Sequence, residues 1–588
     1  MKLKTNMAAM TTTTVVRAPE SPSLTNKNNL DRQPLTMMDM LNGAAGLNWG
    51  YFFHSELDAS ALRASLSRTL ASFPELAGRV VRDKDVLSGV SIELCNHGVP
   101  FVVQRMHKTE FDAMMRSDND VDNNNVTPIG LIDSKHGNYV RLPTAKLFGL
   151  IRHSAPTIDT MLKHPRDDSG YSRDSAPMNV TLTHVVDDSN DNAISMSVLG
   201  ICMNHGFADA ASFFTFVNAW ARCTQMGGED MPTSPCGAQT LRRRITFVPN
   251  ADRLLMEEVC ARVARRTTGQ DILGAHGAKP WSAPSSTAAA AAATTATTTP
   301  SPASESLSAA VDDSEDQQQQ QQQSRTFTRE ELVALAAQRE CDSGAVQHDD
   351  RSLVPLGIYK LSKYTRLAVT GLGSTQCVLR FNRELLASLK ASANARSTND
   401  ALCAHLWRVV ARLRPECRGF NMRLTLVVNV RGDRLDNFVP NQYFGNATTA
   451  CVIEMPHSEL VATGGLANVA AAIRRAVDSI DATHVEREEL WIGFKNKVRY
   501  GLGRIRPNFK LLSRGLFISS FANFDVYGAR FGDDKPAFFV PGVAALTMPY
   551  LYNIAPAPDG DGLDIFVRLP KAKMQSLLAT GGAEAREW

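Results

Sequence analysis

Histidine and aspartate recur at one spacing in this chain, and one such pair is a candidate for catalysis. The pattern H-x-x-x-D begins at four histidines: His54, His164, His184 and His205. Only His205 ends a long apolar run and is followed, from Asp209, by a strongly amphipathic segment. Such a position at the end of an element is a common place for catalytic groups. A histidine satisfied inside the core is the alternative, and aspartate is favoured near helix N-termini whatever its function.

Other motifs that could carry chemistry give weaker signals. Cys202 precedes His205 by three residues, but on an apolar strand it is expected to be a small packed hydrophobic residue. The segments Gly371-Leu-Gly373 and Gly501-Leu-Gly503 lack the third glycine and the strand–helix context of a dinucleotide-binding loop. No H-E-x-x-H or EF-hand pattern occurs, so the sequence predicts no metal site.

The candidate pair needs a strand before it and a helix after it, and the sequence supplies both. Ile194–Met203 is an apolar run short enough for a buried strand, and Asp209–Arg222 places its apolar residues on one helical face. Leu57–Leu76 has leucines at helical spacing. The second half also mixes both signals: a helix capped by Thr398 or Asn399, and strands over Leu424–Val430 and Ile565–Leu569. The predicted fold class is therefore α/β.

Composition indicates a globular protein and argues against two kinds of partner. The 588 residues include 63 Lys and Arg against 60 Asp and Glu, a net charge of +3 without the basic excess typical of nucleic-acid binders. No stretch approaches the roughly 18 apolar residues of a membrane span. Ten cysteines without a CxxC pair favour a reducing compartment. We expect a cytoplasmic protein, although the Thr-rich, acid-poor start leaves an organellar transit peptide open.

Shifts in composition divide the chain into four regions. Residues 1–29 are rich in Thr, Asn and Ser and are predicted to be disordered. Residues 265–350 contain alanine, threonine, proline and glutamine tracts, which cannot bury enough apolar surface to fold, so they are predicted to be a linker. The remaining residues, 30–264 and 351–588, are predicted to be two globular domains.

Seven blocks of sequence, in order along the chain, resemble the BAHD acyltransferases, the HXXXD family that moves acyl groups from coenzyme A to alcohols or amines. The blocks are PLTMMDML (34–41), LRASLSRTLASFPELAGRV (62–80), CNHGVPF (95–101), LGICMNHGFADAASFFTFVNAWA (199–221), STNDALCAHLWR (397–408), NQYFGNAT (441–448) and SSFANFDVYGARFGDDKP (519–536). The resemblance implies two chloramphenicol-acetyltransferase-like α/β domains with a channel between them.

The resemblance also implies roles for individual residues. His205 would be the general base, because imidazole, with a pKa near 6.5, suits proton transfer at neutral pH. Ser519 lies in the place of a Ser/Thr-Ser-Trp segment that helps to stabilise the oxyanion, but Phe521 lacks the indole N–H of that segment. Asp209 would point away from the substrate and pair with an arginine. Arg434 is the better candidate for this partner, and Arg431 is the alternative.

The segment that corresponds to DFGWG in the family, which has a structural role there, is altered in this chain. It becomes RFGDD at 530–534, so that Phe531 and Gly532 remain but Arg530 replaces an aspartate. An arginine there would repel a structural arginine partner. Asp433 could compensate, and the hypothesis is a swapped ion pair between Arg530 and Asp433. The two aspartates after Gly532 are rival partners, and an Arg530 that simply points into water is the alternative.

The leading functional hypothesis is transfer of an acyl group from acyl-CoA to a hydroxyl or amino group of a small molecule. The protein is expected to be a monomer that uses acyl-CoA as a co-substrate and holds no permanently bound cofactor. The basic stretch Lys495–Arg514 either faces the phosphates of coenzyme A or is a solvated face, so no residue is assigned to coenzyme A binding.

Two rival functions stay open at this point. A condensation domain that uses a carrier-bound thioester carries HHxxxDG, where this chain has Asn204 and Ala210 beside the motif. A non-catalytic family member that binds another protein is the second rival. Phe521 and Arg530 favour that rival, and the intact H-x-x-x-D motif opposes it.

Overall fold

The computed structural model describes residues 11–19, 31–43, 45–83, 86, 88–115, 139–142, 156–163, 175–226, 374–435, 439–482, 484–485, 514–532, 535–542 and 549–579. Residues 1–248 and 346–588 cluster into one unit, and 249–345 form a second that holds no described residue. The predicted linker and residues 495–513 of the basic stretch therefore lie outside the described residues. None of the described helices is long and apolar enough to cross a membrane.

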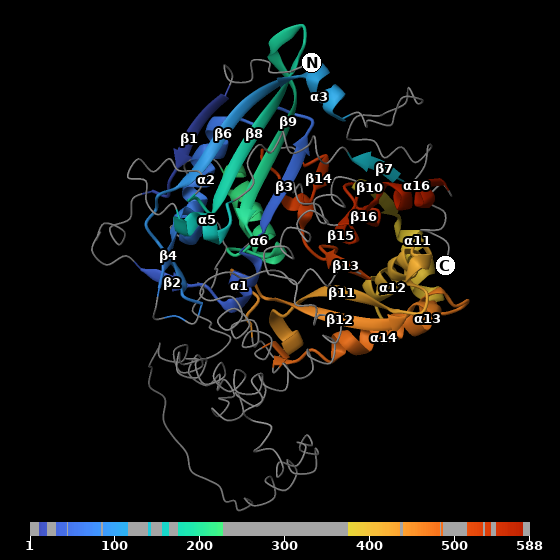
Figure 1. Ribbon diagram of the computed structural model, residues 1–588. Coiled ribbons are helices and arrows are strands. Elements are labelled where there is room, and N and C mark those ends of the chain that lie inside the picture. The colour runs from blue at the N-terminus through green and yellow to red at the C-terminus, as the bar shows by residue number, and fades with distance from the viewer. Residues whose placement is uncertain are drawn as a thin grey trace, which may run out of the picture. The chain divides into compact units, whose positions relative to one another are not determined.

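A six-stranded sheet organises the described part of the N-terminal half. Its spatial order is β1 (Thr11–Val16), β6 (Val99–His107), β8 (Met178–Asp187), β9 (Asn190–Asn204), β3 (Gly46–Phe53) and β14 (Phe538–Val540). β6 and β8 are parallel, and the other neighbouring pairs are antiparallel. In Figure 1 this sheet runs from blue to green except for β14, which is red. Its last strand is thus supplied by the C-terminal part of the chain.

A seven-stranded sheet organises the C-terminal half. Its order is β12 (Thr448–Pro456), β11 (Asn421–Asn429), β13 (Gly515–Ser520), β15 (Leu551–Pro556), β16 (Leu563–Pro570), β10 (Ser374–Phe381) and β7 (Tyr139–Leu142). β13 is parallel to both of its neighbours, β11 and β15. The edge strand β7 comes from the N-terminal half, so each half adds an edge strand to the sheet of the other. The predicted division into 30–264 and 351–588 does not anticipate this exchange.

One strand lies inside the segment that the composition predicts to be disordered. The prediction for residues 1–29 is wrong at Thr11–Val16, which pairs with β6 in register from Thr11 opposite Gln104 to Val16 opposite Val99. The six residues, TTTTVV, are all β-branched, and such side chains favour a pleated strand. Threonine is polar, so the composition of this segment suggests disorder. The segment nevertheless forms a strand, because its backbone pairs with the edge of β6.

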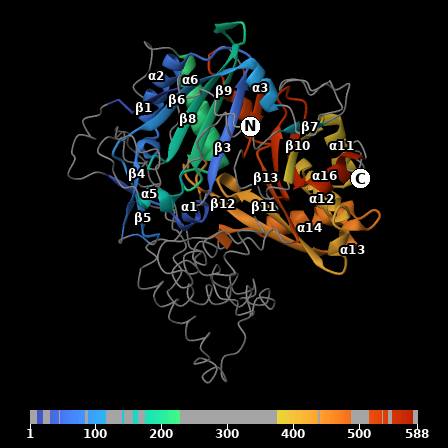
Figure 2. The same cartoon turned by 45° about the horizontal axis from the view of Figure 1, so that its top comes forward.

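A small third sheet and several helices complete the described fold. The sheet has the order β2 (Arg32–Pro34), β5 (Val90–Glu93) and β4 (Arg79–Arg82). The α-helices are α1 (Met37–Asn42), α2 (Ala59–Leu70), α3 (Lys108–Met115), α5 (Ile158–Lys163), α6 (Ala210–Gln225), α11 (Arg383–Ser392), α12 (Thr398–Arg412), α13 (His457–Val461), α14 (Leu466–Asp478) and α16 (Lys571–Ala579). α2 packs on α6, and α12 packs on α14, which also contacts β12 (Figure 2).

The elements predicted around the motif are confirmed. The apolar run at Ile194–Met203 lies in β9, and the amphipathic segment after Asp209 is α6, with Phe213, Phe216 and Trp220 completely buried. Leucines of α2 face the same core. The predicted cap of α12 is wrong by one residue: Ser397 is the N-cap, and its side chain accepts a hydrogen bond from the backbone N–H of Asp400.

Candidate active site

The His205 loop, residues 204–209, joins the end of β9 to the start of α6. The backbone N–H of His205 donates to the carbonyl of Ala45 at 3.0 Å. Asn204 is completely buried, and its amide donates to the carbonyls of Gly43 and Pro156 and accepts from the N–H of Gly206 at 2.8 Å. These bonds fix the backbone on both sides of the histidine.

Gly206 lets this loop pack closely against its surroundings. A Cβ atom at this position would lie 2.7 Å from Cδ1 of Ile158, 2.9 Å from Oδ1 of Asn204 and 3.0 Å from the backbone oxygen of Asp39. The contact with Asn204 lies within the loop itself, the end of the Ile158 side chain could shift, and the 3.0 Å contact with the backbone of Asp39 is tight. A side chain at position 206 would therefore require Asn204 or Ile158 to move.

The imidazole of His205 is only partly exposed, and its Nδ1 is buried without a hydrogen-bond partner among the described residues. Burial lowers the pKa of His205 below its usual value. The carbonyl oxygen of His205 itself, the carboxylate of Asp209 and the side chain of Asn446 oppose this shift without cancelling it. The ring is therefore neutral at neutral pH and can accept a proton.

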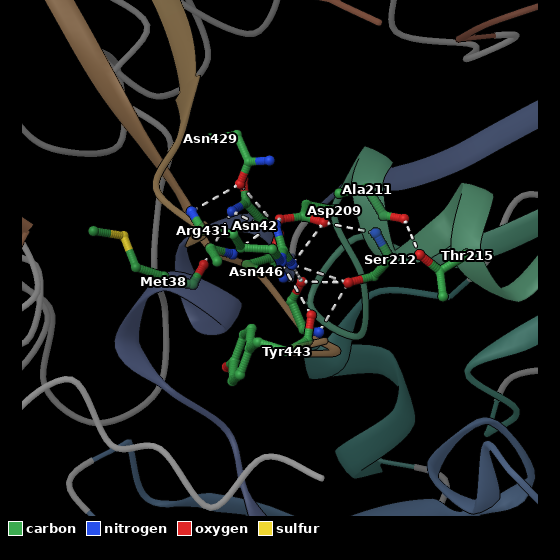
Figure 3. A network of polar contacts seen from close by, with 12 residues as sticks. Met38, Asn42, Asp209, Ala211, Ser212, Thr215, Asn429, Arg431, Tyr443 and Asn446 are labelled. Carbon is green, nitrogen blue, oxygen red and sulfur yellow. Dashed lines mark hydrogen bonds and ion pairs between the residues drawn. The ribbon is translucent and has the colours of Figure 1, made fainter. Parts of the chain in front are cut away.

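Asp209 faces away from the loop into a buried ion pair with Arg431, which follows β11 (Figure 3). The two guanidinium nitrogens of Arg431 lie 2.7 Å and 3.1 Å from the two carboxylate oxygens of Asp209. Burial alone would raise the pKa of Asp209, but the charge of Arg431 and the surrounding hydrogen bonds lower it overall. The choice of Arg434 as the partner is wrong, and the alternative, Arg431, is correct.

The reason lies in the backbone around Arg431. This residue comes two positions after the end of β11 and forms a β-bridge with Val439, which holds it beside the N-terminus of α6. Arg434 lies three residues further on, in a 3₁₀ turn, η5 (Gly432–Leu435). Sequence spacing within VNVRGDRL could not separate the two arginines, because the turn that starts at Gly432 decides which one stays in line with the strand.

The rest of this network, shown in Figure 3, ties the start of α6 to residues 443–447. The hydroxyl of Ser212 donates to the carbonyl of Gly445 at 2.9 Å and accepts from the N–H of Gly445 at 3.0 Å. Arg431 donates to that carbonyl and to the carbonyl of Tyr443. The backbone N–H of Ala447 donates to Asp209 at 2.9 Å. Block NQYFGNAT thus wraps around the N-terminus of α6.

Two buried residues in this region were missed by the sequence analysis, although both lie in blocks that carry the resemblance. Asn446 donates from its side chain to the backbone carbonyl of His205 at 2.7 Å. Asp39, the third residue of α1, accepts hydrogen bonds from both the backbone and the side-chain nitrogen of Asn446 at 2.9 Å. Neither position stood out by composition or spacing, because single Asn and Asp residues are common in turns and helix caps.

Ser519 and Phe521 lie at the end of β13. Ser519 is partly buried and is opposite Asn553 of β15. No hydrogen bond joins Ser519 to His205 among the described residues, so its role in oxyanion stabilisation stays a prediction. The ring of Phe521 is buried, with its centroid 5.2 Å from that of Trp49 and 6.0 Å from that of Phe214.

Because Phe521 fills its site, a larger ring should not fit. We expect Phe521→Trp to lower the free energy of unfolding by about 1–3 kcal/mol, the usual cost of overpacking a core. The matched control is Phe524→Trp, three residues further on, where the ring also contacts Phe214 but is only partly buried. Thermal unfolding of both variants decides the point. Equal stability of Phe521→Trp and the wild type would show that the site has room for an indole.

The altered segment at 530–532 is held by packing and not by a swapped ion pair. Arg530 and Asp433 are both exposed, and no ion pair between them is present among the described residues, so the hypothesis of reversed polarity is wrong. Phe531 is buried, with its ring centroid 4.8 Å from that of Trp220. Gly532 has φ +82° and accepts a hydrogen bond from Gln225 of α6. Exposed charges need no partner, because water solvates them.

The remaining candidates have structural explanations. Cys202 is buried, and burial raises the pKa of its thiol, so it behaves as the packed hydrophobic residue that the sequence predicts. The described residues contain no group of three or more His, Cys, Asp or Glu side chains that could hold a metal ion. The two aspartates after Gly532 lie outside the described residues.

Known sequences match parts of this chain. A sequence profile of the Transferase family matches residues 9–144 and 281–581, more than half of the chain. O-acyltransferase pigD of Monascus ruber is 27% identical over 225 residues, 37% of this chain and 46% of that protein. Putrescine hydroxycinnamoyltransferase 1 of Oryza sativa subsp. japonica is 28% identical over 259 residues, 40% of this chain and 57% of that protein. The chain thus spans about half the length of these relatives.

Comparisons with solved structures concern the fold. Vinorine synthase has a TM-score of 0.51 at 15% identity, with 97% of each chain covered. TRI101 of F. sporotrichioides, complexed with coenzyme A and T-2, has a TM-score of 0.51 at 15% identity, with 93% of this chain and 96% of that chain covered. The predicted chloramphenicol-acetyltransferase-like α/β fold is confirmed. With the profile match and the acyltransferase relatives, these findings show that the chain belongs to the Transferase family, the BAHD acyltransferases.

Proposed function

We propose that this protein transfers an acyl group from acyl-CoA to a hydroxyl or amino group of a small molecule, with His205 as the general base. One observation carries the proposal: His205 is a partly exposed imidazole, kept neutral by burial, on a loop whose backbone is held on both sides. A base must be unprotonated at the working pH and fixed in place to remove a proton efficiently.

The proposed reaction proceeds in two proton transfers within a ternary complex. His205 takes the proton from the acceptor O–H or N–H while the acceptor oxygen or nitrogen attacks the thioester carbonyl carbon. The negative charge that develops on the carbonyl oxygen needs a donor, and the hydroxyl of Ser519 is the proposed one. The carbon–sulfur bond then breaks, and the imidazolium returns its proton to the thiolate of coenzyme A. Atoms and charges balance without a further reactant.

Acyl-CoA is proposed as a co-substrate and not as a bound cofactor. The structure of TRI101 with coenzyme A supports this choice, because that protein shares the fold of this chain. Names of the relatives support both kinds of acceptor: pigD is an O-acyltransferase, and the rice protein is a putrescine hydroxycinnamoyltransferase. The acceptor class proposed here is therefore an alcohol or an amine.

The two rivals have less support. Condensation domains place a second histidine before the motif, whereas the Asn204 amide here is occupied by two backbone carbonyls and one backbone N–H. The departures that favour a non-catalytic protein are Phe521 and Arg530. The first fills an aromatic core, and the second points into water, so neither perturbs the His205 loop.

The experiment is an acyl-transfer assay on the purified full-length chain. Radiolabelled acetyl-, malonyl- and hydroxycinnamoyl-CoA are each offered with a panel of small alcohols and diamines, and both free thiol and labelled product are measured. We expect thiol and acylated product in equal amounts, and only where donor and acceptor are both present. If every combination gives only slow hydrolysis equal to that without protein, the proposal is wrong.

A further inference from the structure

Asn446 of the C-terminal half bonds directly to the backbone of the candidate base. Its side-chain nitrogen donates one hydrogen to the carbonyl of His205 at 2.7 Å and the other to Oδ1 of Asp39 at 2.9 Å. Its side-chain oxygen accepts from the amide of Asn42 at 3.3 Å. Asn446 is completely buried. A buried amide whose two hydrogens and oxygen are all engaged has one orientation, because flipping it would break three bonds.

Asp39 fixes that orientation from the N-terminal half. It is completely buried, and its Oδ1 accepts hydrogen bonds from both the backbone and the side-chain nitrogen of Asn446. Its Oδ2 accepts from the backbone N–H of Thr36, and the hydroxyl of Thr36 accepts from the N–H of Asp39. This reciprocal capping box locks the aspartate at the start of α1. Because the carboxylate cannot rotate, its Oδ1 stays directed at the two nitrogens of Asn446.

We infer that Asn446, oriented by Asp39, is a positioning residue that holds the backbone of His205 for proton transfer. The N–H of His205 is bonded to Ala45 and its carbonyl to Asn446, so the N-terminal half holds one side of the residue and the C-terminal half holds the other. The hydrogen bond from Asn446 goes to the backbone carbonyl of His205, and the Asn446 side chain also raises the pKa of the imidazole, so Asn446 acts on the reaction through the base. The inference rests on the proposed role of His205.

A purely structural role is the alternative, and the chain offers a matched control for it. Asn218 of α6 is also buried, and its side-chain nitrogen donates to the backbone carbonyl of Asp525 at 2.9 Å. It therefore makes the same kind of bond between the same two parts of the chain. No hydrogen bond of a described residue joins Asn218 to the His205 loop. Loss of this bond should affect stability without moving the base.

The test compares Asn446→Ser with Asn218→Ser in the full-length protein. Serine has a single O–H, so at position 446 it can donate a hydrogen bond to Asp39 but not a second one to the carbonyl of His205. We expect Asn446→Ser to lower kcat by about 10²-fold, the usual cost of misplacing a catalytic group by about 1 Å. The KM for acyl-CoA should stay within about twofold, because only the chemical step is affected. Asn218→Ser should keep both constants.

A second readout does not depend on acyl transfer. Diethyl pyrocarbonate modifies neutral imidazoles, and mass spectrometry of the peptide that contains His205 gives the rate at that residue. Release of the carbonyl should make the ring more accessible, so we expect faster modification in Asn446→Ser, several-fold above the wild type and above Asn218→Ser. If Asn446→Ser does not fold, Asp39→Asn, which keeps the size of the side chain and weakens the acceptor, should shift both readouts in the same direction by less.

The outcomes separate this inference from the proposed function. Wild-type kcat and wild-type modification rate in Asn446→Ser would overturn the positioning role, as would equal changes in Asn218→Ser. If the wild-type protein transfers no acyl group, the proposed function fails. The modification rates then still decide whether Asn446 holds His205 in place.

Discussion

Replacing Arg431 with methionine is expected to destabilise the fold by about 3–5 kcal/mol, the cost of leaving one member of a buried ion pair without its partner. Asp209 is buried, and Arg431 supplies the charge that lowers the pKa of its carboxyl group. Without the arginine, a carboxylate stays in the core, and the carbonyls of Tyr443 and Gly445 also lose a donor. Denaturant unfolding of the wild type and the variant measures the difference.

The matched control for this change is Arg423→Met on β11, the strand that ends two residues before Arg431. Arg423 pairs with Glu454 on the adjacent strand β12, but both side chains are partly exposed. Exposed pairs contribute about 1 kcal/mol or less, so this variant should lie close to the wild type. If the two variants lost equal free energy of unfolding, the buried Asp209–Arg431 pair would contribute no more to stability than an exposed pair, which would contradict this prediction.

Replacing His205 with alanine is expected to lower kcat by about 10²–10⁴-fold, the usual contribution of a positioned general base. Acyl-CoA binding should be nearly intact, because the change removes an interaction that acts only in the transition state. The loop should keep its shape, since its backbone bonds to Ala45 and Asn446 do not involve the imidazole. Steady-state kinetics with the donor and acceptor found in the transfer assay give both constants.

The control for His205→Ala is His54→Ala. His54 begins the same H-x-x-x-D spacing, with Asp58 four residues later, but it is exposed, and Asp58 caps α2. We expect turnover within twofold of the wild type. The two variants thus show whether catalysis depends on the H-x-x-x-D motif at the end of β9 or on any histidine with this spacing. Full turnover in His205→Ala would remove this residue from the mechanism.

Much of the local structure around the site could be predicted from the sequence. The apolar run before His205 and the amphipathic segment after Asp209 correspond to β9 and α6, because both patterns are local and each element buries one continuous face. The strand Thr11–Val16 could not be predicted from composition. It pairs with the edge of β6, from Thr11 opposite Gln104 to Val16 opposite Val99, far away in the chain.

The missing parts of the site are all contacts between distant segments. Asp39 and Asn446 are 407 residues apart, and no local pattern says that their side chains meet. Arg431 was distinguished from Arg434 only by the turn that follows it. The swapped pair of Arg530 and Asp433 was a plausible match of charges, but both side chains lie in water, where a match has little energetic value.

The dependence of kcat/KM on pH tests the central claim most directly. A general base must be neutral, so activity should fall as the pH drops through the pKa of His205 and stay flat above it. Because burial lowers that pKa, the acid limb should lie below pH 6.5, the usual value for histidine. The account predicts this limb in the wild type and its loss in the residual activity of His205→Ala. A limb above pH 6.5, or one that persists unchanged in His205→Ala, would contradict it.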